Sequence, residues 1–243
     1  MIAYNPIHYF ELGPIKIYSF GLMFAIGVAV AAFLSYKTAK KYDLDGKKIL
    51  DALVYILVGA LVGARLVYFL LYYYQFSSPV EFFYIWEGGL ASHGGFIGGF
   101  LSFYLFSKKH KINFWKYADL LAPYIALALA IVRIGCFINW DDYGKYTSLP
   151  WGISAEGDFP RHPAQIYHII SDFMVFLILY KIKDKKRFDG QIFLLLVILY
   201  SIGRFIVDFF RDYDYYVWGI APSQIFVTAL FITSIILYRK MKT

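Results

Sequence analysis

Arginines inside apolar segments are the residues of this sequence that most directly suggest chemistry. Arg65, Arg133 and Arg204 each lie within a long apolar run. A charged side chain at the centre of a membrane helix costs about 2.5–3.5 kcal/mol on insertion scales, so such a residue marks a functional site or a paired charge. The planar guanidinium group binds phosphate or carboxylate through two parallel hydrogen bonds. These arginines therefore predict a site for an anionic ligand.

The depth of the polar residues favours one shared site. With a rise of about 1.5 Å per residue, His93, Arg133, Arg204 and Arg65 lie about 6–12 Å from the outer ends of their apolar segments. An arginine near a helix end can instead extend its side chain to the membrane surface, and this alternative stays open for Arg133 and Arg204 taken singly. Four polar residues at similar depth favour a common anion site.

Two features near the arginines have alternative interpretations. Tyr200, Arg204 and Asp208 are spaced by four residues and share one helical face, so Asp208 either orients the guanidinium of a functional site or forms a purely structural ion pair. His93 either acts as a base near neutral pH or is a structural histidine satisfied by hydrogen bonding. The glycines that follow it, at positions 94, 95, 98 and 99, have the spacing of a close contact between helices.

The elements that must position these residues are membrane-spanning helices. Of the 243 residues, 60% are hydrophobic and 17% are charged, which is too apolar for a soluble domain of this size. Apolar runs of about 18 residues or more indicate spanning helices. We predict an all-α polytopic membrane protein with one catalytic domain, residues 1–243, and seven transmembrane helices at residues 17–36, 49–73, 89–107, 117–138, 166–180, 191–210 and 223–238.

The positive charges predict the orientation of these spans. Seventeen of the 24 lysines and arginines lie in the loops after the first, third and fifth spans and in the C-terminal tail, and four lie on the opposite side. By the positive-inside rule the N-terminus is outside and the C-terminus is cytoplasmic. The net charge of +7 then reflects topology and anionic headgroups, with no need for nucleic acid. With this orientation, the arginines and His93 fall in the outer half of the bilayer.

The segments outside the spans have distinct compositions. Residues 1–16 lack the basic start of a cleaved signal peptide and are predicted to form an interfacial arm. Residues 74–88 and 139–165 are rich in aromatic and turn-forming residues and are predicted to be interfacial and cap segments of the outer face. Cys136 is the single cysteine, so an internal disulfide is excluded, and it is expected to pack as a small apolar residue and not to act as a nucleophile. The sequence predicts no metal and no cofactor.

Four motifs together resemble one known family. They are His93–Gly98, Arg133–Gly144, Arg161–Tyr167 and Gly203–Arg211, and shorter matches occur at Leu12–Pro14, Phe20–Met23, Arg65–Tyr68 and Trp86–Gly89. In this order, over nearly the whole chain, they resemble the prolipoprotein diacylglyceryl transferases.

The resemblance implies a seven-span enzyme of the cytoplasmic (inner) membrane whose active site opens toward the outer leaflet. Such an enzyme moves the diacylglyceryl unit of phosphatidylglycerol to the thiol of the lipobox cysteine in a preprolipoprotein signal peptide. A thioether forms and glycerol phosphate is released. The implied partners are therefore phosphatidylglycerol, the preprolipoprotein signal peptide and the bilayer, and no nucleic acid.

The resemblance also assigns residues to roles. The implied catalytic residues are His93, Arg133, Tyr200 and Arg204. The implied substrate-binding residues are Arg133, Arg204, Arg65, Asp208, Asn139, Asp141, Gly144, Gly94 and Gly95. The sequence departs from the family pattern at Phe20, Cys136, Asp141, His168 and Asp208, where the family usually has tyrosine, asparagine, glutamate, glutamate and glutamate.

Other functions remain as alternatives. Arginines deep in the membrane also suit a lipid or anion transporter or a lipid-binding protein, although transporters often have internal repeats and none is evident here. A transferase that uses an ether-linked lipid donor, or another acceptor, is a further alternative. Detection of turnover separates the enzymes from the transporter and the binding protein.

Overall fold

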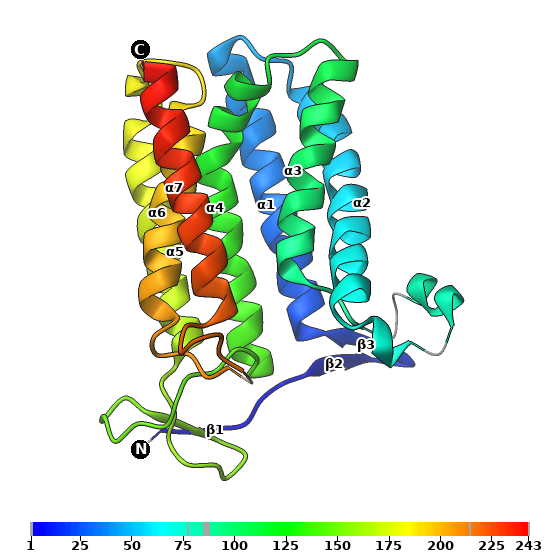
Figure 1. The fold of residues 1–243 in the computed structure, drawn as a ribbon, viewed down its shortest axis with the longest axis vertical. Helices are drawn as coiled ribbons and strands as arrows, with labels where there is room; N and C mark the ends of the chain where they lie inside the picture. The colour runs from blue at the N-terminus through cyan, green and yellow to red at the C-terminus, as the bar shows by residue number, and fades with distance from the viewer. Residues whose placement is uncertain (1, 77, 85–87, 214, 243) are drawn as a thin grey trace. The chain divides into compact units, whose positions relative to one another are not determined.

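The computed structural model describes residues 2–76, 78–84, 88–213 and 215–242, and within them the chain forms seven α-helices and four short β-strands (Figure 1). The chain divides into two compact units. We call Tyr36–Tyr117 the central unit, and Met1–Ser35 together with Ala118–Thr243 the terminal unit. The helices are α1 Ser19–Ala39, α2 Gly46–Leu71, α3 Ser92–Lys109, α4 Phe114–Asn139, α5 Ala164–Ile182, α6 Gln191–Val207 and α7 Pro222–Lys242; the strands are β1 Ile2–Tyr4, β2 Tyr9–Leu12, β3 Ile15–Tyr18 and β4 Ile153–Ala155.

Each of the seven predicted spans overlaps one α-helix, with shifted ends. The first helix begins at Ser19 because residues 17 and 18 end strand β3, and α6 ends at Val207, three residues before the predicted end. Five helices are long and apolar enough to cross a membrane, namely α1, α2, α4, α5 and α7. The glycine-rich α3 is outside this set, and α6 has only 17 residues. These apolar helices indicate a multi-pass membrane protein.

In the terminal unit, the helices α4, α5 and α6 enclose an apolar core that is continuous across all three. Asp119 of α4 fixes the start of α6, since its carboxylate accepts the backbone N–H of Gly190 at 2.8 Å and that of Phe193 at 3.0 Å. A carboxylate at a helix N-terminus also complements the helix dipole. The buried core residues are Ala122, Ala126, Val175, Leu179, Ile192 and Leu196.

The N-terminal segment, which we expected to be an interfacial arm, forms strands. Strand β1 pairs in parallel with β4, with Ile2 opposite Ile153, so the start of the chain joins the segment 139–165 (Figure 1). Strands β2 and β3 form an antiparallel hairpin, and Gly13 has a φ of 62° at its turn. Sequence reasoning missed these strands because each is only three or four residues long.

In the central unit, the helices α2 and α3 meet through glycines. A Cβ atom at Gly94 would lie 2.2 Å from the carbonyl oxygen of Gly63, and one at Gly98 would lie 2.1 Å from that of Gly59. The predicted close contact at positions 94 and 98 is therefore confirmed. After α2 come the short 3-10 helices Tyr73–Gln75 and Pro79–Phe83. The residues Trp86 and Glu87 of one motif lie outside the described residues.

Candidate functional site

The C-terminal end of α4 brings a guanidinium group to a polar loop. Immediately after Asn139, Trp140 and Asp142 have φ values of 59° and 58°, so the chain reverses its direction sharply. This turn places Asp142 Oδ2 2.6 Å from Arg133 Nη1. The other oxygen of Asp142 accepts a hydrogen bond from Arg211 Nη2. One carboxylate therefore bridges two arginines.

The environment of Asp142 favours its ionised form. Burial alone would raise the pKa of this carboxyl, but the positive charges of Arg211 and Arg133 outweigh burial and hold its pKa below the ordinary value. Asp142 is therefore an anion at neutral pH.

Arg204, near the C-terminal end of α6, contacts three different groups. Its Nε lies 3.1 Å from Asp208 Oδ1, its Nη1 donates to His168 Nε2 at 3.4 Å, and its Nη2 donates to the hydroxyl of Tyr213 at 3.4 Å. Asp208 is completely buried and also accepts hydrogen bonds from Tyr213 at 2.8 Å and from Ser223 at 2.6 Å. The predicted contact of Arg204 with Asp208 is thus present, and the carboxylate holds the guanidinium from one side.

The hydroxyl of Tyr213 connects the Arg204–Asp208 pair with Arg211, which contacts Asp142. It accepts a hydrogen bond from Arg204 at 3.4 Å and another from Arg211 at 3.3 Å. The three guanidinium groups of Arg133, Arg204 and Arg211 are thereby linked through Asp142 and Tyr213. We call these three residues the arginine cluster.

Two further side chains of the terminal unit interact electrostatically with the arginine cluster. Tyr200, one turn before Arg204 on α6, lies within electrostatic range of Arg204 and Arg133. The same holds for Asp172, which is buried on α5. A hydroxyl and a carboxyl therefore lie near Arg133 and Arg204.

The loop after α4 contains three predicted substrate-binding residues. Asn139 donates a hydrogen bond to the carboxylate of Asp141, and the carbonyl of Asp141 accepts one from Gln165 Nε2 at 2.7 Å. Gly144 lies between two backbone segments, and a Cβ atom there would lie 2.5 Å from the carbonyl oxygen of His162 and 2.7 Å from that of Phe210. Only glycine allows this close approach, which brings the loop beside Arg211.

Arg161 organises the outer part of the same loop region. Its guanidinium lies 2.7 Å from Asp158 and 2.8 Å from Asp212, and it stacks on the rings of Tyr143 and Tyr146 at 4.6 and 3.9 Å. Its hydrogen bond lowers the pKa of the Asp158 carboxyl. Arg161 therefore joins the segment 143–161 to the segment that follows α6.

The central unit contains the other predicted site residues. Arg65 donates five hydrogen bonds to backbone carbonyls, which belong to Phe82, Gly88, Gly89, Glu81 and Tyr84 at 2.5–3.2 Å. All of its donor nitrogens take part, so Arg65 fixes the segment after α2.

His93 is the second residue of α3 and is half-buried, and it precedes Gly94 and Gly95. It therefore lies at the start of the helix whose glycines contact α2.

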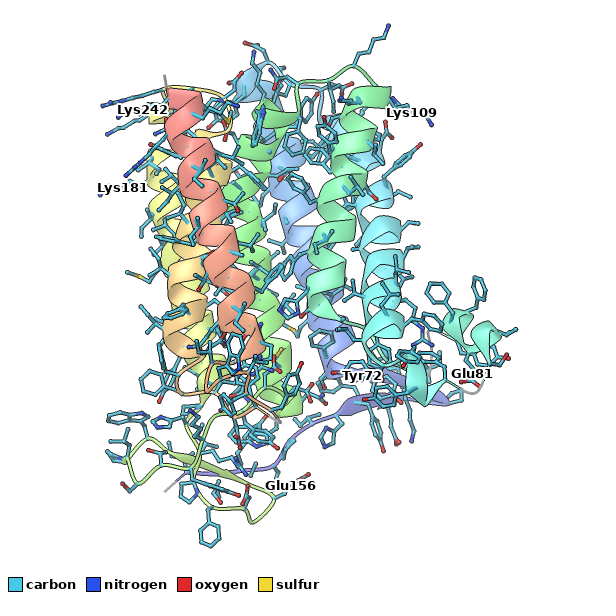
Figure 2. All side chains as sticks on the ribbon, viewed as in Figure 1. Tyr72, Glu81, Lys109, Glu156, Lys181 and Lys242 are labelled. Carbon is cyan, nitrogen blue, oxygen red and sulfur yellow. The ribbon has the colours of Figure 1, made fainter. Side chains whose placement is uncertain are left out.

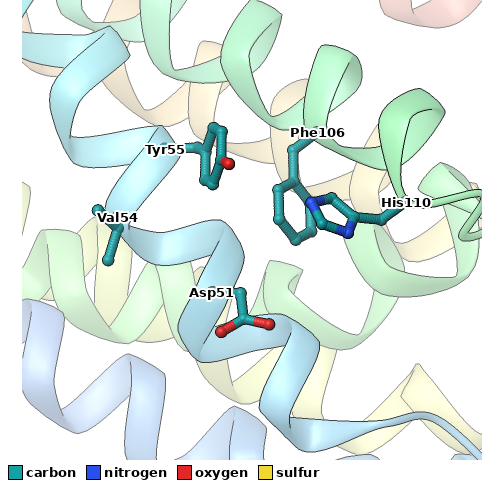
Figure 3. Close-up of a pocket in the computed structure, with 5 residues that line it drawn as sticks. All are labelled: Asp51, Val54, Tyr55, Phe106 and His110. Carbon is teal, nitrogen blue, oxygen red and sulfur yellow. The ribbon is translucent and has the colours of Figure 1, made fainter.

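A separate pocket lies between α2 and α3, with a volume of about 300 Å³ and a lining of Asp51, Val54, Tyr55, Phe106 and His110 (Figure 3). The rings of Phe106 and His110 lie close together in a tilted arrangement, with 4.2 Å between their centroids. A carboxylate and a single imidazole do not provide the cluster of cations that an anion requires. The arginine cluster is therefore the better candidate for an anion site.

Sequence reasoning missed three residues of the network around Arg133 and Arg204. Asp142 is part of a motif, but only its neighbour Asp141 was given a role, and Arg211 was counted as a loop charge. Tyr213 is one of several aromatic residues after α6. The position of Arg211 at the end of the Gly203–Arg211 motif was a signal for its role. No feature of the sequence distinguished Tyr213.

Buried and half-buried arginines held by carboxylates and hydroxyls can bind an anion and stabilise negative charge that develops during a reaction. Figure 2 places Lys181 and Lys242 at the end of the terminal unit opposite Glu156. Fold and site together define a multi-pass membrane protein whose terminal unit holds a cluster of three arginines at the ends of its helices.

Comparison with known proteins identifies the family. Residues 7–239 match the sequence model of the prolipoprotein diacylglyceryl transferase family. The chain belongs to this family. Relatives named phosphatidylglycerol–prolipoprotein diacylglyceryl transferase include those of Finegoldia magna (37% identity, covering 96% of this chain and 94% of the relative), Legionella pneumophila strain Lens (36%; 86% and 84%) and Campylobacter jejuni strain 81-176 (34%; 94% and 91%).

Proposed function

We propose that this protein transfers the diacylglyceryl unit of phosphatidylglycerol to the thiol of a lipobox cysteine in a preprolipoprotein. Its relatives are named as diacylglyceryl transferases that act between phosphatidylglycerol and a prolipoprotein. The observation that carries the proposal is the arginine cluster, because a phosphate ester is the group that the donor lipid presents to cations. The protein would cross the cytoplasmic membrane seven times, with the cluster toward the outer leaflet.

The proposed reaction needs a nucleophile, a base and a leaving group. The thiolate of the peptide attacks the glycerol carbon and forms the C–S bond, while the C–O bond to phosphate breaks and its electron pair stays on the phosphate oxygen. Glycerol phosphate leaves as a dianion, and the thiol proton passes to a base. A free thiol with a pKa of about 8.5 is mostly protonated at neutral pH, so this base matters.

The residues of the site suit different parts of this reaction. Arg133 and Arg204 hold the phosphate and stabilise the charge that grows on its bridging oxygen. Asp208 fixes the orientation of Arg204. We assign proton removal to His93, with Tyr200 near the leaving phosphate. Asn139, Asp141 and Gly144 shape the loop that borders the arginines, Gly94 and Gly95 give α3 its close approach to α2, and Arg65 supports the segment after α2.

Incubation of the purified protein with phosphatidylglycerol and a lipobox peptide tests the proposal. We expect the peptide to gain the mass of one diacylglyceryl unit, and a peptide with an alkylated cysteine to gain nothing. An Arg204→Lys variant should lose at least about a hundredfold in rate, because an ammonium group cannot make the three separate contacts of this guanidinium. Binding of the lipid without any change in peptide mass would instead favour a transporter or a lipid-binding protein.

A further inference from the structure

The carboxylate of Asp142 occupies Arg133, one of the two arginines that hold the phosphate in the proposed function, together with its neighbour Arg211 in the arginine cluster. Arg133 Nη1 and Arg211 Nη2 each contact a different oxygen of this one group, with 2.6 Å between Arg133 and Asp142. Carboxylates and phosphates present the same kind of acceptor to guanidinium groups. Asp142 therefore stands where an anionic ligand of the cluster would bind, and the two cannot hold the same donors together.

The cluster also has hydrogen-bonding capacity that Asp142 does not use. The Nε of Arg211 is buried and has no acceptor among the described residues. A carboxylate has two oxygens, and both face the two arginine nitrogens already named. A phosphate monoester has more acceptor oxygens and more negative charge, so it can bind the cluster more strongly than Asp142 does.

The carboxylate of Asp142 is accessible to water. Asp142 is 29% exposed, so water can solvate its carboxylate when it leaves the arginines. Trp140 and Asp142 both have positive φ values, which are rare for residues other than glycine. The backbone of the turn has hydrogen bonds of its own, since Asp141 N–H donates to the carbonyl of Cys136 at 2.8 Å and Gln165 Nε2 donates to the carbonyl of Asp141 at 2.7 Å. The carboxylate of Asp142 can therefore leave the arginines by rotation of its side chain, with the turn kept in place.

We propose that Asp142 is a tethered competitor of phosphate for Arg133 and Arg211, which limits the affinity of the site for anions and displaces the phosphate monoester product. This inference rests on the proposed function. Because the carboxylate is attached to the chain beside the arginines, its effective concentration is high, and it needs only weak intrinsic affinity to compete. A site of three arginines without such a competitor would hold the dianionic product strongly and slow the next cycle.

Binding of glycerol phosphate and of inorganic phosphate to the purified full-length protein, measured by calorimetry, tests the competitor. In Asp142→Asn we expect both ligands to bind about tenfold more tightly. This is the gain expected when the competing carboxylate is removed and one charge-assisted contact of the arginines passes to the ligand. Asparagine tolerates positive φ and keeps the side-chain size. Asp142→Gly also suits the turn and gives a second neutral variant if the first does not fold.

Asp158→Asn is the matched control, because Asp158 is also paired with an arginine of the same loop region, Arg161, outside the arginine cluster. Its affinity for phosphate should equal that of the wild type. Unchanged or weaker phosphate binding in both Asp142 variants would overturn the proposal, and weaker binding would mean that Asp142 positions the arginines for the ligand.

The transfer reaction gives a second readout. In Asp142→Asn the KM for phosphatidylglycerol and the inhibition constant of glycerol phosphate should both fall, whereas a rise in either contradicts competition. The binding measurement needs no transfer. If the wild type transfers no lipid but Asp142→Asn binds phosphate more tightly, the competitor role stands and the proposed function fails; if transfer occurs without tighter binding, the competitor role alone fails.

Discussion

At the scale of residues, the arginines of the terminal unit differ in the kind of carboxylate that they contact. Asp208 is buried, contacts Arg204 from the position that directly follows α6 and is held by two hydroxyls, so it is fixed. Asp142 comes from a loop and is partly exposed, so it can be exchanged for another anion. An arginine–carboxylate pair therefore orients the guanidinium at Arg204, whereas at Arg133 it competes with the anionic ligand.

The role of His93 as the base can be separated from lipid binding. We expect His93→Gln to slow transfer by about 10²–10⁴-fold, the usual contribution of a general base, and to leave phosphatidylglycerol binding intact because the arginines remain. Raising the pH should partly restore the rate, since more of the peptide thiol ionises unaided. Rates and lipid affinities of this variant and of Arg204→Ala over a pH series provide the comparison.

Arg204→Ala should lose lipid binding and show no recovery at alkaline pH. A His93→Gln variant that loses lipid affinity to the same degree, or that does not recover, would make His93 a positioning residue.

Asp142 also predicts a pH dependence of stability. The folded protein lowers the pKa of this carboxyl below its ordinary 3.8, so its ion pairs stabilise the fold above that value and are lost as the pH falls through the folded pKa. At neutral pH, Asp142→Asn should be less stable by about 1–3 kcal/mol, because Arg133 and Arg211 lose their partner. This difference should shrink as the pH drops below about 4.

Thermal unfolding of both proteins in detergent across this pH range measures the difference. The same gap in Tm at every pH would show that the charge of Asp142 does not cause it.

At the scale of elements, glycine and the ends of helices position the functional groups. Gly144 allows the loop after α4 to lie against the backbone of Phe210, next to Arg211. Glycines also allow α2 and α3 to approach closely, and α3 carries His93 at its start. A side chain added at such a contact must displace backbone, which cannot yield as a flexible side chain does.

Adjacent glycines of α3 provide a matched test. A Cβ atom at Gly98 would lie 2.1 Å from the carbonyl oxygen of Gly59, whereas one at Gly99 would meet only side-chain atoms of Ile56 and Ala60 at 3.5–3.6 Å and the Ile56 backbone oxygen at 3.7 Å. Gly98→Ala should therefore lower stability by about 1–3 kcal/mol. Gly99→Ala should be neutral or gain up to about 1 kcal/mol from the helix preference of alanine.

Thermal unfolding of both variants in the same detergent measures the difference in stability between Gly98→Ala and Gly99→Ala. Equal effects of the two substitutions would mean that α2 and α3 do not meet at Gly59 and Gly98 in the membrane.

At the scale of the whole molecule, charge and site lie at opposite ends of the terminal unit. The lysines of the α5–α6 connection and of the C-terminus gather at one end, and the loops around the arginine cluster are at the other, with Glu156 (Figure 2). The positive-inside rule then predicts that the arginine end faces away from the cytoplasm. A donor lipid of the outer leaflet would reach the site from this side.

Labelling of introduced cysteines tests this orientation. The only native cysteine, Cys136, is buried and can be replaced by alanine. In that background, Phe159→Cys, at a position that is 76% exposed, should react with an impermeant maleimide in intact cells. Lys185→Cys should react only after the membrane is permeabilised. The reverse pattern would place the arginine cluster toward the cytoplasm.

The sequence by itself determined the seven helical segments, the chain's family resemblance and the contact between Arg204 and Asp208. These depend on local properties, since apolar runs and a spacing of four residues can be read along the chain. Only the tertiary structure decided which groups meet from distant positions. Asp142 meets Arg211 across 69 residues and His168 meets Arg204 across 36, while Arg65 binds backbone carbonyls that no pattern of side chains reveals. Such contacts arise from the packing of helices and loops, which residue spacing does not encode.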